Sequence, residues 1–249
     1  MPERVVSLAP SATATLRALD ADDRLVGVTA HGDGPADATV LGGWLSPDLD
    51  AVEDLDPDLV LTADPLQAEV HDRLVDRGLG TCHVEPRTLE GALESMETVG
   101  TAAGLADEAA AFADRCRERV AAVSDAVAGR GRPVVYCEEW QDPPMAAGNW
   151  VPDAVRAAGG RYPFVDAGER SREVERETVE AAGPEHVVVH VCGRGDDVDP
   201  DSIARRGWDL PALAEDRVHV VGDDLFNQPG PGLVDGVEWL AGRLHPEAV

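Results

Sequence analysis

Two tryptophans stand in one short segment whose composition favours contact with a large flat molecule. The run CEEWQDPPMAAGNW (Cys137–Trp150) also holds two prolines, in a chain with only 4% aromatic residues. We predict a rigid, apolar, partly exposed loop between a strand and a helix. Tryptophan offers a broad contact area with little entropy lost on binding, so Trp140 and Trp150 are the principal candidate ligand-binding residues, with Glu139 beside them. The alternative is that each tryptophan covers the core beneath a long loop.

A second segment, DDLFNQPGP (Asp223–Pro231), combines hydrogen-bonding and stacking groups. Asn227 and Gln228 could hydrogen-bond to amide groups of a ligand, and Phe226 could stack or pack against it. Trp44, in a glycine-rich loop earlier in the chain, is a further candidate of the same kind.

Two more segments carry groups capable of metal or thiol chemistry. His31, in HGDGP (His31–Pro35), could coordinate a metal, although a lone histidine in a glycine-bracketed loop more often makes hydrogen bonds. The run CGR (Cys192–Arg194) would put a thiol and a guanidinium near the same opening. Cys192 could be a nucleophile or a soft ligand, but no histidine adjoins it in sequence. We therefore predict no metal site and no catalytic residue.

The common enzyme motifs are missing from the sequence. It has no GxSxG, no GxxxxGK, no HExxH, and no GxGxxG after the first expected strand. The turn that follows this strand, Ala9–Thr13, opens a helix whose terminal amides could face an anionic or carbonyl group, with Ser11 as its expected cap. We expect a protein that is not an enzyme and has no catalytic cofactor.

The elements that must position these residues alternate along the whole chain. Short apolar runs and helical patterns follow one another, which is typical of βαβ units with mainly parallel sheets. Strands are predicted at Val5–Ala9, Leu25–Thr29, Leu59–Thr62, Thr81–Val84, Pro133–Cys137, His186–Val191 and Arg217–Val221. Helices are predicted at Ala12–Leu19, Leu66–Arg77, Leu89–Gly100, Val151–Ala158, Arg176–Ala182 and Pro231–Leu244. The fold class is α/β, with two Rossmann-like lobes.

A long helical segment separates the two halves. Leu105–Gly129 has no proline and a glycine only at its end, and its 25 or so residues would span roughly 37 Å as a helix. We predict one backbone helix (104–130) joining an N-terminal lobe (1–103) to a C-terminal lobe (131–249).

An internal echo relates the two predicted lobes. Ser46–Thr62 and Glu173–His190 each read as an acidic helix, a proline turn and a β-branched strand, followed by a loop, Ala63–Pro65 or Cys192–Gly195. Ligands of open α/β sheets bind outside the carboxyl ends of the strands, so the echo predicts that one loop from each lobe, with Pro65 in the first, lines a common cleft. The alternative is that such proline turns are ordinary chemistry before a strand.

Composition limits the partners and the habitat. The 249 residues are 43% hydrophobic, enough for two lobes, and carry 21 basic residues, all arginine, against 48 acidic ones, for a net charge of −27. This acidity excludes nucleic acid as an expected partner and fits adaptation to high salt. The four cysteines form no CxxC pair.

The sequence shows no run long enough to span a bilayer, no signal peptide and no lipid-attachment cysteine. We expect no membrane insertion, a monomer, and a cytoplasmic location as written, or an extracytoplasmic one if a leader was removed.

Three stretches resemble a known family, the cobalamin and iron-siderophore solute-binding proteins of ABC importers. They are RVVSLAPSATATLRALDADDRLVGVT (Arg4–Thr29), LDPDLVLT (Leu55–Thr62) and NQPGPGLVDGVEWLAGRLHPE (Asn227–Glu247). The similarity extends over nearly the whole chain, and Glu138–Gly160 is similar to the subgroup labelled cobalamin-binding.

This resemblance implies a cobalamin-like corrinoid held between the lobes as a ligand, with no obligatory protein ligand to cobalt. By position, the loops that line the cleft in that family carry His31, Trp44, Pro65, Trp140, Trp150 and Phe226. It further implies an ABC permease as partner, docked through one acidic residue on each lobe. Glu69 matches the first such position, and Asp199 or Asp201, of which we choose Asp201, is a looser match to the second.

Two alternatives stay open. The ligand could be a ferric siderophore or haem, although anionic siderophores need several cations and the predicted cleft offers only Arg194 and Arg87. The chain could instead be an intracellular corrinoid or metal enzyme that uses His31, Cys192, and Glu138 or Glu139.

Overall fold

The structure, a computed structural model, describes residues 1–248 and groups them into two compact units. Unit 1 comprises Met1–Pro86, Gly91–Cys116 and Pro229–Pro231. Unit 2 comprises Arg87–Glu90, Arg117–Gln228 and the residues from Gly232 onward. The lobe limits predicted at residues 103 and 131 stay a prediction.

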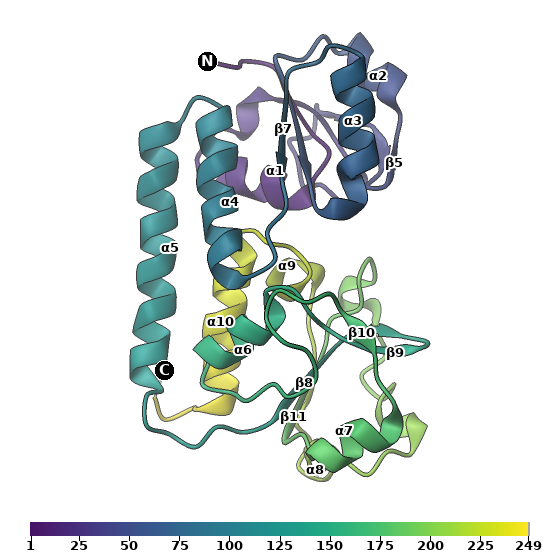
Figure 1. Ribbon diagram of the computed structural model, residues 1–249, viewed down its shortest axis with the longest axis vertical. Helices are drawn as coiled ribbons and strands as arrows, with labels where there is room; N and C mark the ends of the chain where they lie inside the picture. Colours follow the sequence, from purple (N-terminus) through teal and green to yellow (C-terminus); the bar gives the residue numbers. More distant parts are fainter. Residues whose placement is uncertain (249) are drawn as a thin grey trace. The chain divides into compact units, whose positions relative to one another are not determined.

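Unit 1 is built on a five-stranded parallel sheet in the order β3-β2-β1-β6-β7. The last strand of this order, β7, is labelled in Figure 1. Its strands are β1 (Val5–Ser7), β2 (Leu25–Val28), β3 (Thr39–Val40), β6 (Leu59–Ala63) and β7 (Thr81–Val84). A separate hairpin pairs β4 (Gly42–Gly43) with β5 (Ser46–Pro47). The helical elements are α1 (Pro10–Ala18), η1 (Asp22–Arg24), α2 (Leu49–Asp54), η2 (Pro65–Gln67), α3 (Ala68–Asp76) and most of α4 (Leu89–Ala102).

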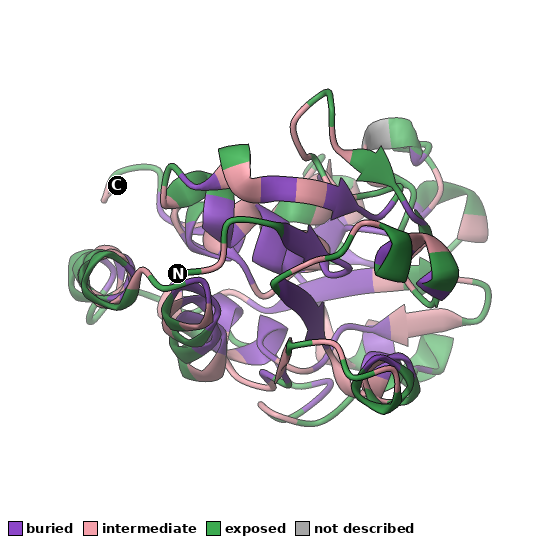
Figure 2. Cartoon of the chain, turned by 90° about the horizontal axis from the view of Figure 1, so that it is seen from above, coloured by how far each residue is buried: buried purple, intermediate pink, exposed green. Residues whose placement is uncertain are grey.

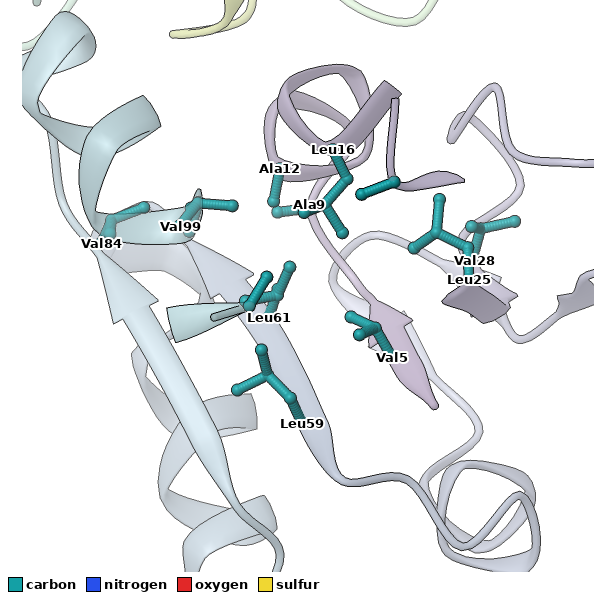
Figure 3. Close-up of a cluster of buried hydrophobic side chains, with 13 residues drawn as sticks. Val5, Ala9, Ala12, Leu16, Leu25, Val28, Leu59, Leu61, Val84 and Val99 are labelled. Atoms are coloured by element: carbon teal, nitrogen blue, oxygen red, sulfur yellow. The ribbon is translucent and has the colours of Figure 1, made fainter. Parts of the chain in front are cut away.

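Helices cover both faces of this sheet because successive strand residues point to opposite sides. Val5 and Leu61 face one way, into a cluster with Leu16 of α1 and Val99 of α4 (Figure 3). Val6 and Val60 face the other way, into a second cluster with residues of α2 and α3. Two-sided burial explains why these strands appear in the sequence as uninterrupted apolar runs. Figure 2 shows the buried strands and the exposed outer sides of the helices.

Unit 2 has a mixed five-stranded sheet in the order β10-β9-β8-β11-β12. Strands β8 (Val135–Gln141), β11 (His186–Val189) and β12 (Val218–Val220) are parallel, while β9 (Pro144–Ala146) runs antiparallel to both of its neighbours, β8 and β10 (Arg172–Glu173). The helical elements are α6 (Val151–Ala157), α7 (Arg176–Ala182), η3 (Gly195–Asp197), η4 (Ala204–Arg206), α8 (Pro211–Ala214), α9 (Asp223–Phe226) and α10 (Pro231–Leu244).

The predicted fold class is confirmed. All seven expected strands and six expected helices are present, with shifted ends, in two α/β units with mainly parallel sheets. The long helix is α5 (Ala106–Ala126), whose first half groups with unit 1 and whose second half groups with unit 2. Within the described residues, no helix is both long and apolar enough to cross a membrane.

Two local predictions were wrong. The segment Cys137–Trp150 is not a loop but mainly a β-hairpin, because β8 continues through Trp140 and turns into β9. Its two prolines suggested a loop, yet Pro143 lies in the turn and Pro144 begins β9, where a missing amide is tolerated. Ser11 is not the cap of α1, because the helix starts two residues earlier than predicted, at Pro10, with Ala9 at the cap position and no side-chain bond. Trp44, predicted in a glycine-rich loop, lies in the turn at the tip of the β4–β5 hairpin.

Candidate functional site

In each sheet there is one point from which the chain adds later strands in opposite directions. In unit 1, β1 leads through α1 to β2 on one side, and β6 leads through α3 to β7 on the other, so the reversal lies between β1 and β6. In unit 2 the corresponding point lies between β8 and β11. In open α/β sheets, crevices that bind ligands form at the carboxyl ends of the strands at such points. Each unit therefore has one candidate binding region at the carboxyl ends of its central strands, which we call the candidate edge of that unit.

A buried glutamine organises the candidate edge of unit 1. The side chain of Gln67 is fully buried, and its Nε2 donates to the carbonyls of Leu8 at 2.9 Å and Trp44 at 2.7 Å. Its Oε1 accepts from the amide of Ala63 at 2.8 Å. One side chain thus joins the segment after β1, the end of β6 and the β4–β5 hairpin. Gln67 could not be predicted from the sequence, because a single glutamine near a proline carries no recognisable signal.

The three predicted ligand residues of unit 1 lie on segments that meet here. Pro65 precedes Gln67 by two residues and begins η2, and Trp44 at the hairpin tip is half-buried. His31 is exposed in the segment after β2, which is tied to the hairpin by the bond from the Ala30 amide to the Gly42 carbonyl, 2.9 Å. The structure brings these three segments together without bonding the three side chains to one another.

We expect Gln67→Ala to destabilise unit 1 by about 2 kcal/mol, because it removes three hydrogen bonds and leaves a buried amide unsatisfied. Hydrogen exchange of residues 41–48 should accelerate, since the hairpin loses its attachment. Leu66→Ala is the matched control, because its neighbouring side chain is exposed and its loss should change stability by less than about 0.5 kcal/mol. Equal exchange rates in the two variants would contradict the role given to Gln67.

The candidate edge of unit 2 gathers residues from three strand ends. The amide of Cys192 donates to the carbonyl of Glu139 at 3.1 Å, linking the ends of β11 and β8. The amide of Gly193 donates to Oδ2 of Asp223 at 3.0 Å, which adds the start of α9 after β12. Cys192 and Arg194 are exposed on this edge, and Glu139 is half-buried.

Behind this edge lies a buried polar network. Trp150 Nε1 donates to the carbonyl of Phe226 at 2.7 Å, and both side chains are buried. The Asn227 amide donates to the carbonyl of His190 and to Asp223 Oδ1, both at 2.8 Å, while its oxygen pairs with Nδ1 of His190. Burial lowers the pKa of His190 to about 4, so the ring is neutral at pH 7. Trp150, Phe226 and Asn227 therefore fix the edge from within, as the core-covering alternative for Trp150 anticipated.

The remaining aromatic candidate is open to solvent. The Trp140 side chain, on β8, is 45% exposed, and its Nε1 donates to the carbonyl of Asp142 at 2.9 Å. This bond fixes the orientation of the indole while leaving much of the side chain uncovered. Gln228 is half-buried just after Asn227.

The Cys192 thiol lacks the surroundings of an activated nucleophile. Desolvation, and then the nearby carboxylates of Asp223 and Glu139, raise its pKa above the ordinary value. A reactive cysteine needs a lowered pKa, so the thiol form dominates at pH 7. Within the described residues, no cluster of three or more potential metal ligands occurs.

A buried ion pair supports the hairpin that carries Trp140. Glu138 is fully buried and receives two guanidinium bonds from Arg206, at 2.6 and 2.8 Å, and the Tyr136 hydroxyl donates to it at 2.9 Å. The Arg206 guanidinium lies over the ring of Trp208, with Cζ 5.0 Å from the ring centroid. From the sequence, Glu138 was a candidate only as a catalytic group, because its partner Arg206 is 68 residues away.

The two predicted docking residues are both exposed. Glu69 lies in the first turn of α3, and Asp201 lies in the segment between η3 and η4. The other acidic residue considered there, Asp199, is paired with Arg205 at 2.6 Å.

Comparisons with known proteins agree with this architecture. A family model described as periplasmic binding protein matches residues 5–225. The cobalamin-binding protein of Halobacterium salinarum is 32% identical over 260 residues, which cover 98% of this chain and 70% of that protein.

Solved structures share the fold. The periplasmic heme-binding protein from Roseiflexus sp. RS-1 in apo form has a TM-score of 0.84 and 21% identity, with 100% of both chains covered. The periplasmic vitamin B12 binding protein of Vibrio cholerae has a TM-score of 0.79 and 22% identity, with 98% of this chain and 96% of that chain covered.

Proposed function

Because the chain belongs to the periplasmic binding protein family, we propose that it is a non-enzymatic solute-binding protein whose ligand is a cobalamin-like corrinoid. The observation that carries the ligand class is the 32% identity to a cobalamin-binding protein along 98% of the chain. The exposed indole of Trp140 supports it, since a corrin ring is large and partly apolar. The raised pKa of Cys192 disfavours the enzyme alternative.

The ligand-contacting residues are assigned to the candidate edge of each unit. In unit 1 they are His31, Trp44 and Pro65, and Gln67 attaches the hairpin of Trp44 to the segment after β1. In unit 2 the exposed or half-buried residues are Glu139, Trp140, Cys192, Arg194 and Gln228. Trp150, Phe226 and Asn227 position them from below.

Transport is the second part of the proposal. An ABC permease is the partner, Glu69 and Asp201 contact its arginines, and the site of action is extracytoplasmic, as the names of the two structural neighbours suggest. Charge reversal at Glu69 should prevent copurification with the cognate permease, and unchanged copurification would remove this assignment.

The ligand is tested by titrating the purified protein at high salt with cyanocobalamin, cobinamide, hemin and a ferric siderophore. Calorimetry should show saturable 1:1 binding of a corrinoid, with tryptophan quenching beyond that of free tryptophan in the same solution. Binding of hemin or the siderophore alone would reassign the ligand. The absence of heat and quenching with every corrinoid would reject the corrinoid proposal.

We expect Trp140→Ala to weaken corrinoid binding about tenfold, equal to about 1.4 kcal/mol, because it removes exposed aromatic contact area. Trp140→Phe is the matched variant and should retain most of the affinity. Calorimetry measures both, and an alanine variant with unchanged affinity would remove Trp140 from the site.

A further inference from the structure

A cavity of about 740 Å³ lies in unit 2, at the end of the sheet opposite the candidate edge. Residues 130–133 precede β8, Glu185 and His186 lie at the start of β11, and Arg217 precedes β12, so the cavity opens at the amino ends of the parallel strands. The end of α10 completes it with Arg243 and His245. All its lining residues belong to unit 2.

The residues that line this cavity are mainly basic, whereas the protein as a whole is strongly acidic. Four of the 21 arginines of a chain with net charge −27, Arg130, Arg132, Arg217 and Arg243, line this one cavity, against a single carboxylate, Glu185. An acidic surface adapted only for solubility would not gather arginines around a hollow. The concentration of positive charge indicates a negatively charged occupant.

Most of these guanidinium groups keep hydrogen-bonding capacity. Within residues 1–248, only Arg217 of the four forms a salt bridge, with Glu215 at 2.7 Å. Arg132 donates to the carbonyl of Gly160 at 2.8 Å, and Arg243 lies over the ring of Trp239. Each guanidinium carries five N–H donors in a planar fork that matches carboxylate and phosphate oxygens, so several donors stay available in each case.

A buried histidine forms part of the cavity wall. His186 is 5% exposed, lines the cavity, and its Nδ1 has no hydrogen-bond partner within the described part of the chain. Its ring is stacked with that of His219 at 5.8 Å between centroids. The Nδ1 atom is closed off from solvent, so His186 contributes to the wall of the cavity and supplies no donor to its occupant.

We propose that this cavity binds a polyvalent oxyanion, a small molecule carrying several phosphate or carboxylate groups. The volume lies in the range of small-molecule sites and exceeds what one phosphate group fills, and four guanidinium groups match more than one anionic group. The site is separate from the corrinoid proposal, because it lies at the opposite end of the unit 2 sheet and contains none of the proposed corrinoid-contacting residues.

Calorimetry of the full chain with pyrophosphate, citrate and orthophosphate tests the proposal at 0.2 and 1 M NaCl. We expect 1:1 binding of pyrophosphate or citrate that is tighter than that of orthophosphate and persists at 1 M salt, where the Debye length is about 3 Å and only contact interactions survive. Tighter pyrophosphate binding would indicate a phosphate-bearing ligand, and tighter citrate binding a carboxylate-bearing one.

Matched variants locate the site. Arg130→Gln and Arg243→Gln should each weaken binding about tenfold, because each removes a charged hydrogen-bond donor. Arg170→Gln, which changes an exposed arginine of unit 2 outside the cavity, should leave the affinity unchanged. Circular dichroism verifies that each variant is folded. No binding of either polyanion, or equal weakening by Arg170→Gln, would overturn the proposal and leave the corrinoid titration unaffected.

Discussion

Replacing Arg206 by alanine is expected to destabilise the sheet of unit 2 by about 3 kcal/mol. The change leaves the fully buried carboxylate of Glu138 without its guanidinium partner, and breaking a buried ion pair from one side costs about 3–5 kcal/mol. We expect a cost at the lower end of this energy range, because 18% of the Arg206 side chain is exposed to solvent. The neighbouring Tyr136 hydroxyl, which donates to the same carboxylate, cannot replace a charge.

The adjacent residue supplies a matched control. Arg205 is also paired with an acidic residue, Asp199, at 2.6 Å, but both side chains are more than half exposed. An exposed pair contributes about 0–1 kcal/mol, so Arg205→Ala should have little effect. Hydrogen exchange of residues 135–141 measures the local free energy of opening in both variants. If the two variants exchange alike, Glu138 is not held as described.

The ion pair also has a functional consequence. Arg206 Nη2 reaches the carbonyl of Gln141 at 3.3 Å, and Gln141 Nε2 donates to Ser202 Oγ at 2.9 Å. These bonds attach the 202–208 segment to the end of β8, next to Trp140. Arg206→Ala should therefore also weaken corrinoid binding, although Arg206 is not among the proposed contacts.

Gly148→Ala is expected to destabilise unit 2 by a similar amount, about 3 kcal/mol. A Cβ at this position would lie 2.4 Å from the carbonyl oxygen of Glu169 and 2.5 Å from backbone atoms of Arg170 and Ser171. Backbone cannot move aside as a side-chain end can, so the cost reaches the upper part of the overpacking range. The displaced segment contains Trp150, whose bond to Phe226 supports the candidate edge.

Gly242→Ala is the control for this substitution. Gly242 lies in α10 with no atom within 4 Å of the added Cβ, so alanine should stabilise the helix by about 0.5–1 kcal/mol. Urea unfolding followed by circular dichroism distinguishes the two variants, since their midpoints should shift in opposite directions. If the urea midpoint of the Gly148→Ala variant equals that of the unmodified protein, the backbone of residues 169–171 moves away from the added Cβ at little energetic cost.

Local patterns in the sequence were sufficient to predict the architecture. The apolar runs of β1, β6, β8 and β11 and the proline-free helix α5 predicted two parallel α/β units and the helix common to both. These predictions succeeded because buried strands and helices each produce a characteristic pattern of apolar residues within a short stretch of sequence. The carboxyl-end rule then identified the segments of His31, Pro65 and Cys192 as edges of the two sheets.

The tertiary structure decided which of these side chains face solvent and what holds them. Trp140 and Trp150 are equivalent in sequence terms, yet one is exposed and the other is hydrogen-bonded in the core, because β8 continues into a hairpin. Gln67, the Glu138–Arg206 pair and the arginine-lined cavity each depend on residues brought together from distant parts of the chain. Such pairings produce no periodic pattern in the sequence. Whether a polar side chain is buried, and which opposite charge it meets, is decided only when separate elements pack together.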